Sequence, residues 1–185
     1  MRLLSFAFFC ITLAGCTTIQ HSTRLSTSLH AKEYNSIAAQ YMDRPTFSAV
    51  EKMSDGETVL SVSIDNYGSA QSSLRFSKKH VQEYLALIAK YSEWEQFAKS
   101  RGDAFTKEIG SASSWGNGMA GALKFTFHSG NSNVHFLSIA FCAAGTCLED
   151  KALYFDAKNT TELKALLQNL KSGAIQQKDI DSVYR

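Results

Sequence analysis

The sequence predicts an α+β fold in which an antiparallel sheet carries its helices on one face. Two runs of the chain, residues 46–100 and 122–172, each read as three strands followed by a helix. The strands alternate apolar and polar residues, as residues 60–64 do, which is typical of a sheet with one buried face. With 185 residues, 44% of them hydrophobic, the chain can form one core, so we expect a single domain over residues 31–172.

The first residues have the pattern of a secretory signal. A single arginine is followed by a short apolar run, residues 3–13, whereas a membrane-spanning helix needs about 20 residues. The run ends in Leu13-Ala14-Gly15-Cys16, which resembles the lipobox of bacterial lipoproteins. The resemblance is confined to this start of the chain and does not extend to the body.

The lipobox resemblance implies that residues 1–15 are removed by cleavage between Gly15 and Cys16. It also implies that Cys16 carries a thioether-linked diacylglycerol and an acylated amino terminus. Several acyl chains on one residue would hold the protein firmly on a membrane, because a single chain binds only marginally. In Gram-negative lipoproteins an Asp after the lipid cysteine favours the inner membrane. Thr17 therefore implies the outer membrane, facing the periplasm, with the cell surface as an alternative.

Residues 16–30 are rich in Ser and Thr and predict a lipidated, flexible tether. Residues 31–42 have apolar side chains at helical spacing and predict a short amphipathic helix, which Pro45 ends. The side chains that carry this spacing are Tyr34, Ile37, Ala38 and Tyr41.

The first strand–helix unit spans residues 46–100. Its strands are expected near residues 46–52, 58–65 and 72–77, and its helix near residues 78–100. Asp55-Gly56 is a hairpin signal between the first two strands, and Ser77 is the expected N-cap of the helix. The apolar stripe of the helix consists of Val81, Tyr84, Leu85, Ile88 and Tyr91.

Residues 101–121 link the two units, and the part from Gly110 to Gly121 is rich in Gly and Ser. This composition predicts a loop, and long loops without structure are often functional. Trp115 and Met119 in this loop are candidates for a binding lip. The alternative is a mobile linker whose Trp115 packs onto the core.

The second unit spans residues 122–172, and residues 173–185 form a C-terminal tail. Its strands are expected near residues 122–129, 133–142 and 151–156, and its helix near residues 160–171. Asn159 with Glu162 gives a capping pattern at the start of this helix, and Gly173 ends it. The stripe of this helix consists of Leu163, Leu166, Leu167 and Leu170.

The two units are similar in sequence. Residues 74–87 align without gaps onto residues 153–166, and residues 59–64 align onto residues 136–141. The pattern fits an internal duplication of a β-β-β-α unit. Chance similarity between two amphipathic strand–helix units is the alternative.

Four cysteines occur in the chain. Cys10 belongs to the signal, and Cys16 is the lipid-bearing residue that the resemblance implies. Cys142 and Cys147 remain as an even pair in an exported protein, which predicts a disulfide across the intervening turn. Their spacing is not that of a redox CxxC pair, and no second cysteine pair is present to complete a zinc site.

No catalytic, cofactor or metal motif is recognisable in the sequence. His128 and His135 flank a turn, but the apolar alternation of their strands places them on opposite faces, so we expect no metal site there. The formal net charge of +2 is too small to favour a nucleic-acid partner.

The sequence thus predicts a lipid-anchored envelope protein that acts as a non-enzymatic binding or accessory module, without a cofactor. The expected partners are the membrane and an envelope protein. Two other hypotheses stay open: an inhibitor or immunity-type lipoprotein directed against a hydrolase or toxin, and a hydrolase of unrecognised type.

Overall fold

The computed structural model describes residues 17–65, 72–116, 118–131 and 133–175. The predicted signal residues 1–15, the lipidation residue Cys16 and most of the predicted tail lie outside the described residues.

The chain forms two antiparallel sheets and two helices, which confirms the predicted α+β fold. The first sheet has the spatial order β1 (Ile19–Leu25), β4 (Thr46–Met53), β5 (Thr58–Ile64) and β6 (Ser72–Ser77). The second has the order β3 (Gln40–Asp43), β2 (Lys32–Asn35), β11 (Leu153–Phe155), β9 (Val134–Ala143), β8 (Met119–Asn131) and β7 (Phe105–Gly116), with β10 (Thr146–Cys147) paired to β9. The helices are α1 (Val81–Arg101) and α2 (Ala157–Ser172), and two short 3₁₀ turns occur at Lys78–His80 and Glu149–Lys151.

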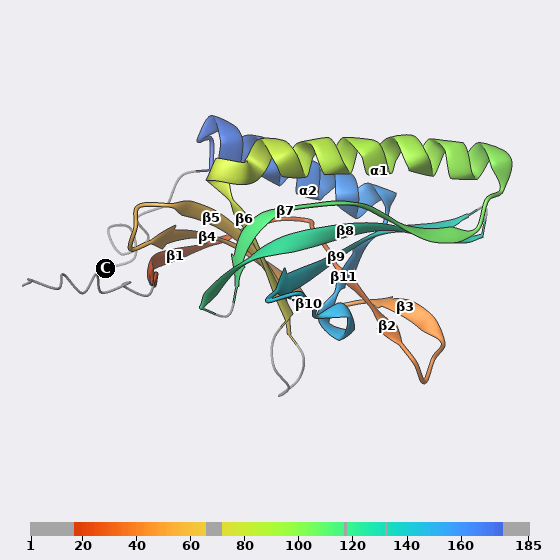
Figure 1. The fold of residues 1–185 in the computed structure, drawn as a ribbon, viewed down its shortest axis with the longest axis horizontal. Coiled ribbons are helices and arrows are strands. Elements are labelled where there is room, and N and C mark those ends of the chain that lie inside the picture. The colour runs from red at the N-terminus through yellow and green to blue at the C-terminus, as the bar shows by residue number, and fades with distance from the viewer. Residues whose placement is uncertain (1–16, 66–71, 117, 132, 176–185) are drawn as a thin grey trace, which may run out of the picture.

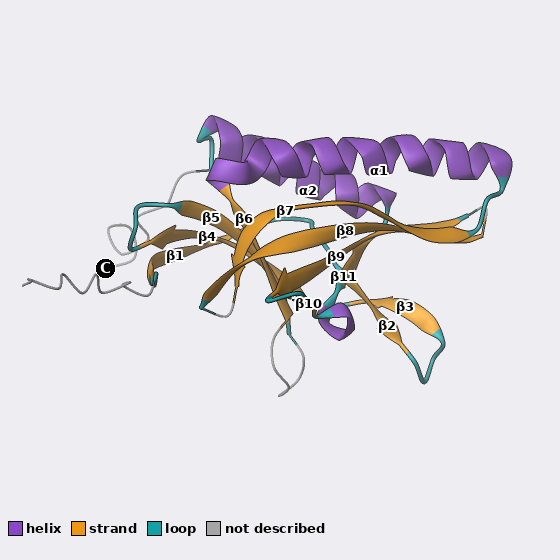
Figure 2. Cartoon of the chain, in the orientation of Figure 1, coloured by secondary structure: helices purple, strands orange, loops and turns teal. Residues whose placement is uncertain are grey.

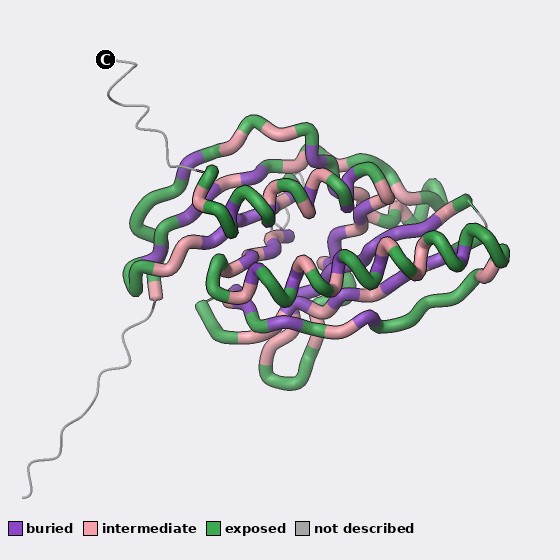
Figure 3. Tube along the Cα trace, turned by 90° about the horizontal axis from the view of Figure 1, so that it is seen from above, coloured by how far each residue is buried: buried purple, intermediate pink, exposed green. Residues whose placement is uncertain are grey.

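Both helices lie on the same face of the sheets and pack against each other (Figures 1 and 2). α1 also contacts β7, β8 and β9, while α2 contacts β5, β9 and β11, so the helices cover both sheets. The core lies between these two layers, and Figure 3 shows buried backbone beneath the helices. Its largest fully buried side chains are Tyr84, Tyr91, Phe76, Phe125, Phe127 and Phe155.

Each predicted unit has the predicted order of elements. β4, β5, β6 and α1 form the first. β8, β9, β11 and α2 form the second, in which the short strand β10 comes between β9 and β11. The similar order is compatible with a duplication, which remains a prediction. Ser77 is a cap as predicted, but of the 3₁₀ turn that leads into α1, where its side chain accepts from the Lys79 amide. Gly173 ends α2 as predicted, with a φ of 77°. The second cap was predicted wrongly, because Asp156 is the N-cap and accepts from the Asn159 amide.

The predicted tether is wrong for residues 19–25, which form β1 at the edge of the first sheet. Only Thr23 of this strand is buried, so its side chains carry no apolar alternation that the sequence could reveal. The strand is held instead by its backbone ladder with β4. The following residues, Leu29 and Ala31, are buried in the core.

The helix predicted over residues 31–42 is also wrong, because β2 and β3 form a hairpin there. Tyr34 and Tyr41 are seven positions apart, which fits a helical stripe, but in the structure they face each other across the hairpin with ring centres 5.2 Å apart. The Asn35 side chain accepts hydrogen bonds from the amides of Ile37 and Ala38, both at 2.9 Å, and so forms the turn.

The predicted Gly/Ser loop over residues 110–121 is largely strand. β7 and β8 pair along almost their whole length, up to the pair of Gly116 with Met119. The Asn117-Gly118 dipeptide in the sequence between them is a strong hairpin signal, and it outweighs the Gly- and Ser-rich composition that predicted a loop. Gly121 lies in β8 against β9, where a Cβ would be 2.3 Å from the carbonyl oxygen of Cys142. Close strand packing, and not flexibility, explains this glycine.

Candidate functional site

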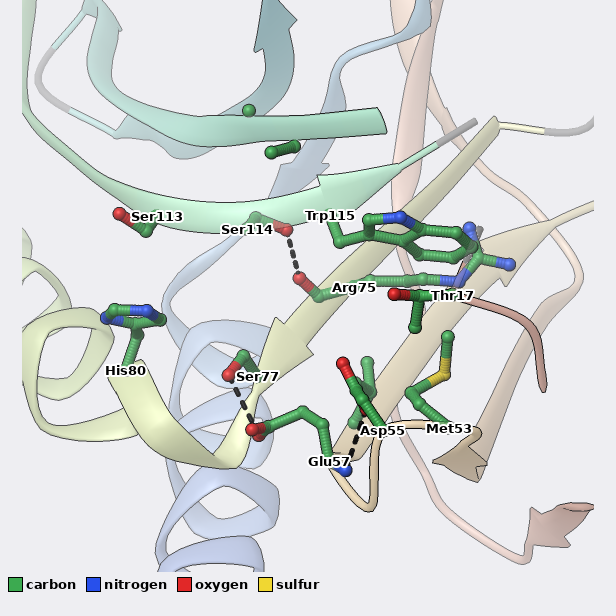
Figure 4. A pocket seen from close by; sticks show the side chains of 13 residues that line it. Thr17, Met53, Asp55, Glu57, Arg75, Ser77, His80, Ser113, Ser114 and Trp115 are labelled. Atoms are coloured by element: carbon green, nitrogen blue, oxygen red, sulfur yellow. Dashed lines mark hydrogen bonds between the residues drawn. The ribbon is translucent and has the colours of Figure 1, made fainter. Parts of the chain in front are cut away.

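One candidate site lies where the two sheets meet. β6 and β7 are edge strands of different sheets, and the Ser114 hydroxyl joins them by donating a 2.5 Å hydrogen bond to the Arg75 carbonyl. The buried Tyr84 hydroxyl accepts from the Ser77 amide at 3.3 Å and donates to the Ser113 carbonyl. Burial raises the pKa of Tyr84 to about 12, so its hydroxyl remains protonated and able to donate. A pocket of about 270 Å³ opens beside this junction, and we call it the Trp115 pocket (Figure 4).

Arg75 forms one wall of the Trp115 pocket. Its guanidinium carbon lies 5.1 Å from the centre of the Trp115 ring, and its Nε donates a 2.9 Å hydrogen bond to Oε2 of Glu51. Glu51 is only 6% exposed. The charge of Arg75 is therefore offset by a nearly buried carboxylate, while the indole holds the guanidinium in place.

Glu57 forms the opposite part of the pocket, at the start of the 3₁₀ turn that precedes α1. One of its carboxylate oxygens accepts from the Ser77 hydroxyl at 2.9 Å and from the Lys79 amide at 3.1 Å. A negative group at this position is favoured by the unpaired amides and dipole at a helix start. Ser77 and Glu57 thus stabilise the beginning of the helix.

His80 also lines the pocket, but its hydrogen bonding points to another neighbour (Figure 4). Its Nδ1 lies 2.9 Å from a carboxylate oxygen of Glu83 on α1. Among the described residues, no hydrogen bond joins His80 to Ser77 or to Ser113. The pocket therefore gathers serine, histidine and acidic side chains without linking them as a nucleophile and its base.

The predicted binding residues Trp115 and Met119 lie at the paired ends of β7 and β8. Trp115 lines the pocket and packs on the guanidinium of Arg75. This packing also fits part of the alternative prediction, in which the Trp115 ring packs onto the body of the protein. Met119 is 50% exposed next to the hairpin tip. Thr17, which the sequence analysis assigned to a tether, lines the same pocket.

The predicted disulfide residues are adjacent across β9 and β10. The sulfur atoms of Cys142 and Cys147 are 1.99 Å apart, at disulfide distance. The bridge closes the tight turn in which Ala144 has a φ of 50° and Gly145 a φ of 80°. It lies in the sheet that supports the Trp115 pocket and does not line the pocket itself.

His128 and His135 point to opposite faces of the second sheet, as the sequence predicted. His135 is 4% exposed and stacks on Phe127 with ring centres 6.0 Å apart on the core face. His128 lies on the outer face, where its Nδ1 is 2.7 Å from the Thr106 hydroxyl and its ring is 5.8 Å from that of Tyr41. Burial lowers the pKa of His128. Within the described ranges, no group of three or more His, Cys, Asp or Glu side chains is placed to hold a metal ion.

A second candidate surface, which the sequence analysis missed, is the hairpin of β2 and β3. Three large apolar side chains are exposed on it: Ile37 at 96%, Tyr34 at 50% and Met42 at 42%. Its signal in the sequence was Asn35, a turn-forming residue placed between two tyrosines that pair across the strands.

No protein-family model matches the chain, and neither the curated proteins nor the solved structures include a match to it. In the described part of the chain, no helix is both long enough and apolar enough to cross a membrane.

Proposed function

We propose that this chain is a lipid-anchored protein of the outer membrane that binds an envelope protein through the β2–β3 hairpin, without catalysing a reaction. The lipobox supports the anchor. The observation that carries the binding role is the exposure of three large apolar side chains on one hairpin, with Tyr34 and Met42 on its two faces and Ile37 in its turn. Single exposed apolar residues are common on protein surfaces, whereas a group of them on one projecting element is typical of an interaction site.

The hairpin is fixed in shape, which lowers the entropy that binding would cost. Lys32 forms ion pairs with Asp43 at 2.6 Å and with Asp156 at 3.6 Å at the base of the hairpin. Burial alone would lower the pKa of Lys32, but the Asp43 and Asp156 carboxylates together outweigh burial, and the net pKa is raised. The Lys32 ammonium therefore stays charged in its ion pairs. Tyr41 packs its ring 4.8 Å from that of Tyr154 on the second sheet.

The position of the hairpin also supports this role. In Figure 1 the hairpin projects from the side of the second sheet away from the helices, and it lies far from β1, where the described chain begins. A lipid on Cys16 would be attached to the residue before Thr17. The hairpin would then be presented away from the membrane, where another envelope protein can reach it.

The same hairpin gives a second candidate function, an inhibitor or immunity-type lipoprotein. A rigid hairpin with an apolar residue at its tip has a shape that can enter the cleft of a hydrolase or toxin. A serine hydrolase site in the Trp115 pocket would need His80 to act on a pocket serine such as Ser77 or Ser113. His80 is bonded to Glu83 instead, and Ser77 is bonded to Glu57.

A photo-crosslinking amino acid at position 37 tests the proposed function in living cells. We expect one discrete adduct from position 37 and none from Gln168, an exposed control residue on α2. The adduct should disappear when Tyr34→Ala and Met42→Ala are combined with the probe. An adduct with a hydrolase or toxin would favour the second candidate. The absence of any adduct specific to position 37, in cells where the protein is acylated at Cys16, would contradict the binding role.

A further inference from the structure

We propose that the end of the domain around Thr17 rests on the lipid surface, with Ile19, Trp115 and Met119 in the interface. The proposal rests on the lipid anchor of the proposed function and goes beyond it by assigning the membrane-facing surface. It gives Trp115 and Met119 a lipid partner, whereas the hairpin of β2 and β3 takes the protein partner.

The described chain begins close to the proposed lipid anchor. The Thr18 amide donates to the Ser54 hydroxyl at 3.0 Å, and the Ser54 amide donates to the Thr18 carbonyl at 2.8 Å. The folded body therefore starts only two residues after Cys16. Consecutive Cα atoms are about 3.8 Å apart, so an anchor on Cys16 leaves no room for a long spacer between lipid and body.

Apolar side chains lie at this end of the domain. Thr17, Met53, Trp115 and Ala120 line one pocket, Ile19 pairs with Met53, and Met119 precedes Ala120. Ile19 is 40% exposed, Met119 is 50% exposed, and Trp115 is partly exposed. Tryptophan is enriched where proteins meet the membrane–water interface, because its ring is apolar and its N–H is polar.

The charges that line the Trp115 pocket indicate the kind of lipid. Arg75 is offset by Glu51, and the carboxylates of Asp55 and Glu57 line the same pocket. In the part of the chain that the structure describes, neither Asp55 nor Glu57 forms an ion pair. The lining of the Trp115 pocket therefore carries no surplus of cations that would draw it to anionic lipids. We expect this end of the domain to contact a neutral phosphatidylcholine surface through its apolar side chains.

The two tryptophans provide a matched pair of reporters. Trp115 lies at the pocket, whereas Trp94 lies far along α1 from the pocket residue His80, about 20 Å away at 1.5 Å per residue. Because the chain has two tryptophans, Trp94→Phe leaves Trp115 as sole reporter and Trp115→Phe leaves Trp94.

The experiment uses the full lipidated protein, purified from membranes and reconstituted into phosphatidylcholine vesicles whose acyl chains carry bromine. We expect bromine to quench most of the fluorescence of the Trp94→Phe protein and little of that of the Trp115→Phe protein. Wild-type protein, which keeps both tryptophans, should show intermediate quenching and serves as a check without any substitution. Met119→Asp in the Trp94→Phe background should reduce the quenching severalfold, and Ile37→Asp should not.

The mass of the same sample separates the two proposals. An acylated protein whose Trp115 is not quenched, or is quenched no more than Trp94, would overturn the membrane-facing surface and leave the anchor standing. A protein without acyl groups on Cys16 would overturn both the anchor and the surface that depends on it.

Discussion

Tyr84 on α1 donates a hydrogen bond to the backbone carbonyl of Ser113 on β7, at the place where the two sheets adjoin. The same hydroxyl accepts from the amide of Ser77, the last residue of β6. One buried side chain on a helix thus connects the edge strands of two different sheets. This relationship explains why the sheets, which share no backbone ladder, hold a fixed arrangement around the Trp115 pocket.

We expect Tyr84→Phe to destabilise the protein by about 1 kcal/mol, because the Ser113 carbonyl and the Ser77 amide each lose a hydrogen-bond partner. The control is Tyr34→Phe, which removes the hydroxyl of a half-exposed ring and should change stability little. Urea unfolding of both variants measures the difference. Equal stabilities would show that the Tyr84 hydroxyl does not join the sheets.

Substitution of Arg75 by Met should destabilise the protein by about 2 kcal/mol. The change leaves Glu51, whose side chain is 9% exposed, without its cation, and breaking a fully buried pair costs about 3–5 kcal/mol. The cost should shrink when Glu51→Gln is present as well, since no unpaired charge then remains. A double-mutant cycle measures this coupling, and additive effects would argue against the ion pair.

Gly121→Ala should destabilise the protein by about 1–3 kcal/mol or more through overpacking. The new Cβ would lie 2.3 Å from the Cys142 carbonyl oxygen and 2.7 Å from the ring of Phe141. Gly130→Ala is the matched control in the same strand, because the nearest atom to its Cβ would be 3.8 Å away. If thermal melting shows both variants to be equally stable, β8 and β9 do not pack as described.

Removal of the Cys142–Cys147 bridge by a double serine substitution should cost about 2 kcal/mol, by the loop entropy of so short a ring. For a chain of this length, this corresponds to a melting temperature lower by roughly 4–8 °C. Reductant should lower the melting temperature of the wild-type protein and leave the double variant unchanged. A wild-type protein that melts identically with and without reductant would show that the bridge is not formed.

His128 should make the protein less stable in mild acid. Burial lowers its pKa in the folded state, so the unfolded chain takes up the proton first as the pH falls. The contribution of neutral His128 to the free energy of unfolding is fully present above the pKa of the unfolded chain, which is about 6.5. It is lost as the pH falls from there through the lower pKa of the folded state. The melting temperature of the wild-type protein should therefore fall more than that of His128→Gln between about pH 7.5 and pH 5. If the melting temperatures of the two proteins fall in parallel as the pH is lowered, His128 is not the cause of the loss of stability.

The parts of the fold that could be predicted are those whose apolar residues repeat with the period of a strand or a helix. Residues 60–64 alternate strictly, and both helices have continuous apolar stripes, so β5, α1 and α2 lie where the pattern placed them. β1 was missed because an edge strand needs only a backbone ladder, and its side chains are mostly exposed. The hairpin of β2 and β3 was missed because a cross-strand tyrosine pair has the same spacing as two turns of a helix.

The candidate site was predictable only in part. Trp115 stood out in the sequence because a large ring in a Gly-rich segment is unusual. Its neighbours come from β4, β6 and the turn after β4, and no local pattern indicates that Glu51 and Arg75 pair across an intervening strand. The Asn117-Gly118 dipeptide could have identified the strands on either side of the predicted loop.

The placement of β1 has a mechanical consequence. Thr17 precedes the end of β1 that pairs with the end of β4, and the strand runs from there into the body of the first sheet. A force that pulls on the chain at Thr17, along the strand, would act on the whole β1–β4 ladder in shear, so its hydrogen bonds would share the force and break together. Peeling the strand away sideways would break the same bonds one after another. The domain is therefore built to resist extraction from its N-terminal end more strongly than its short and largely exposed first strand suggests.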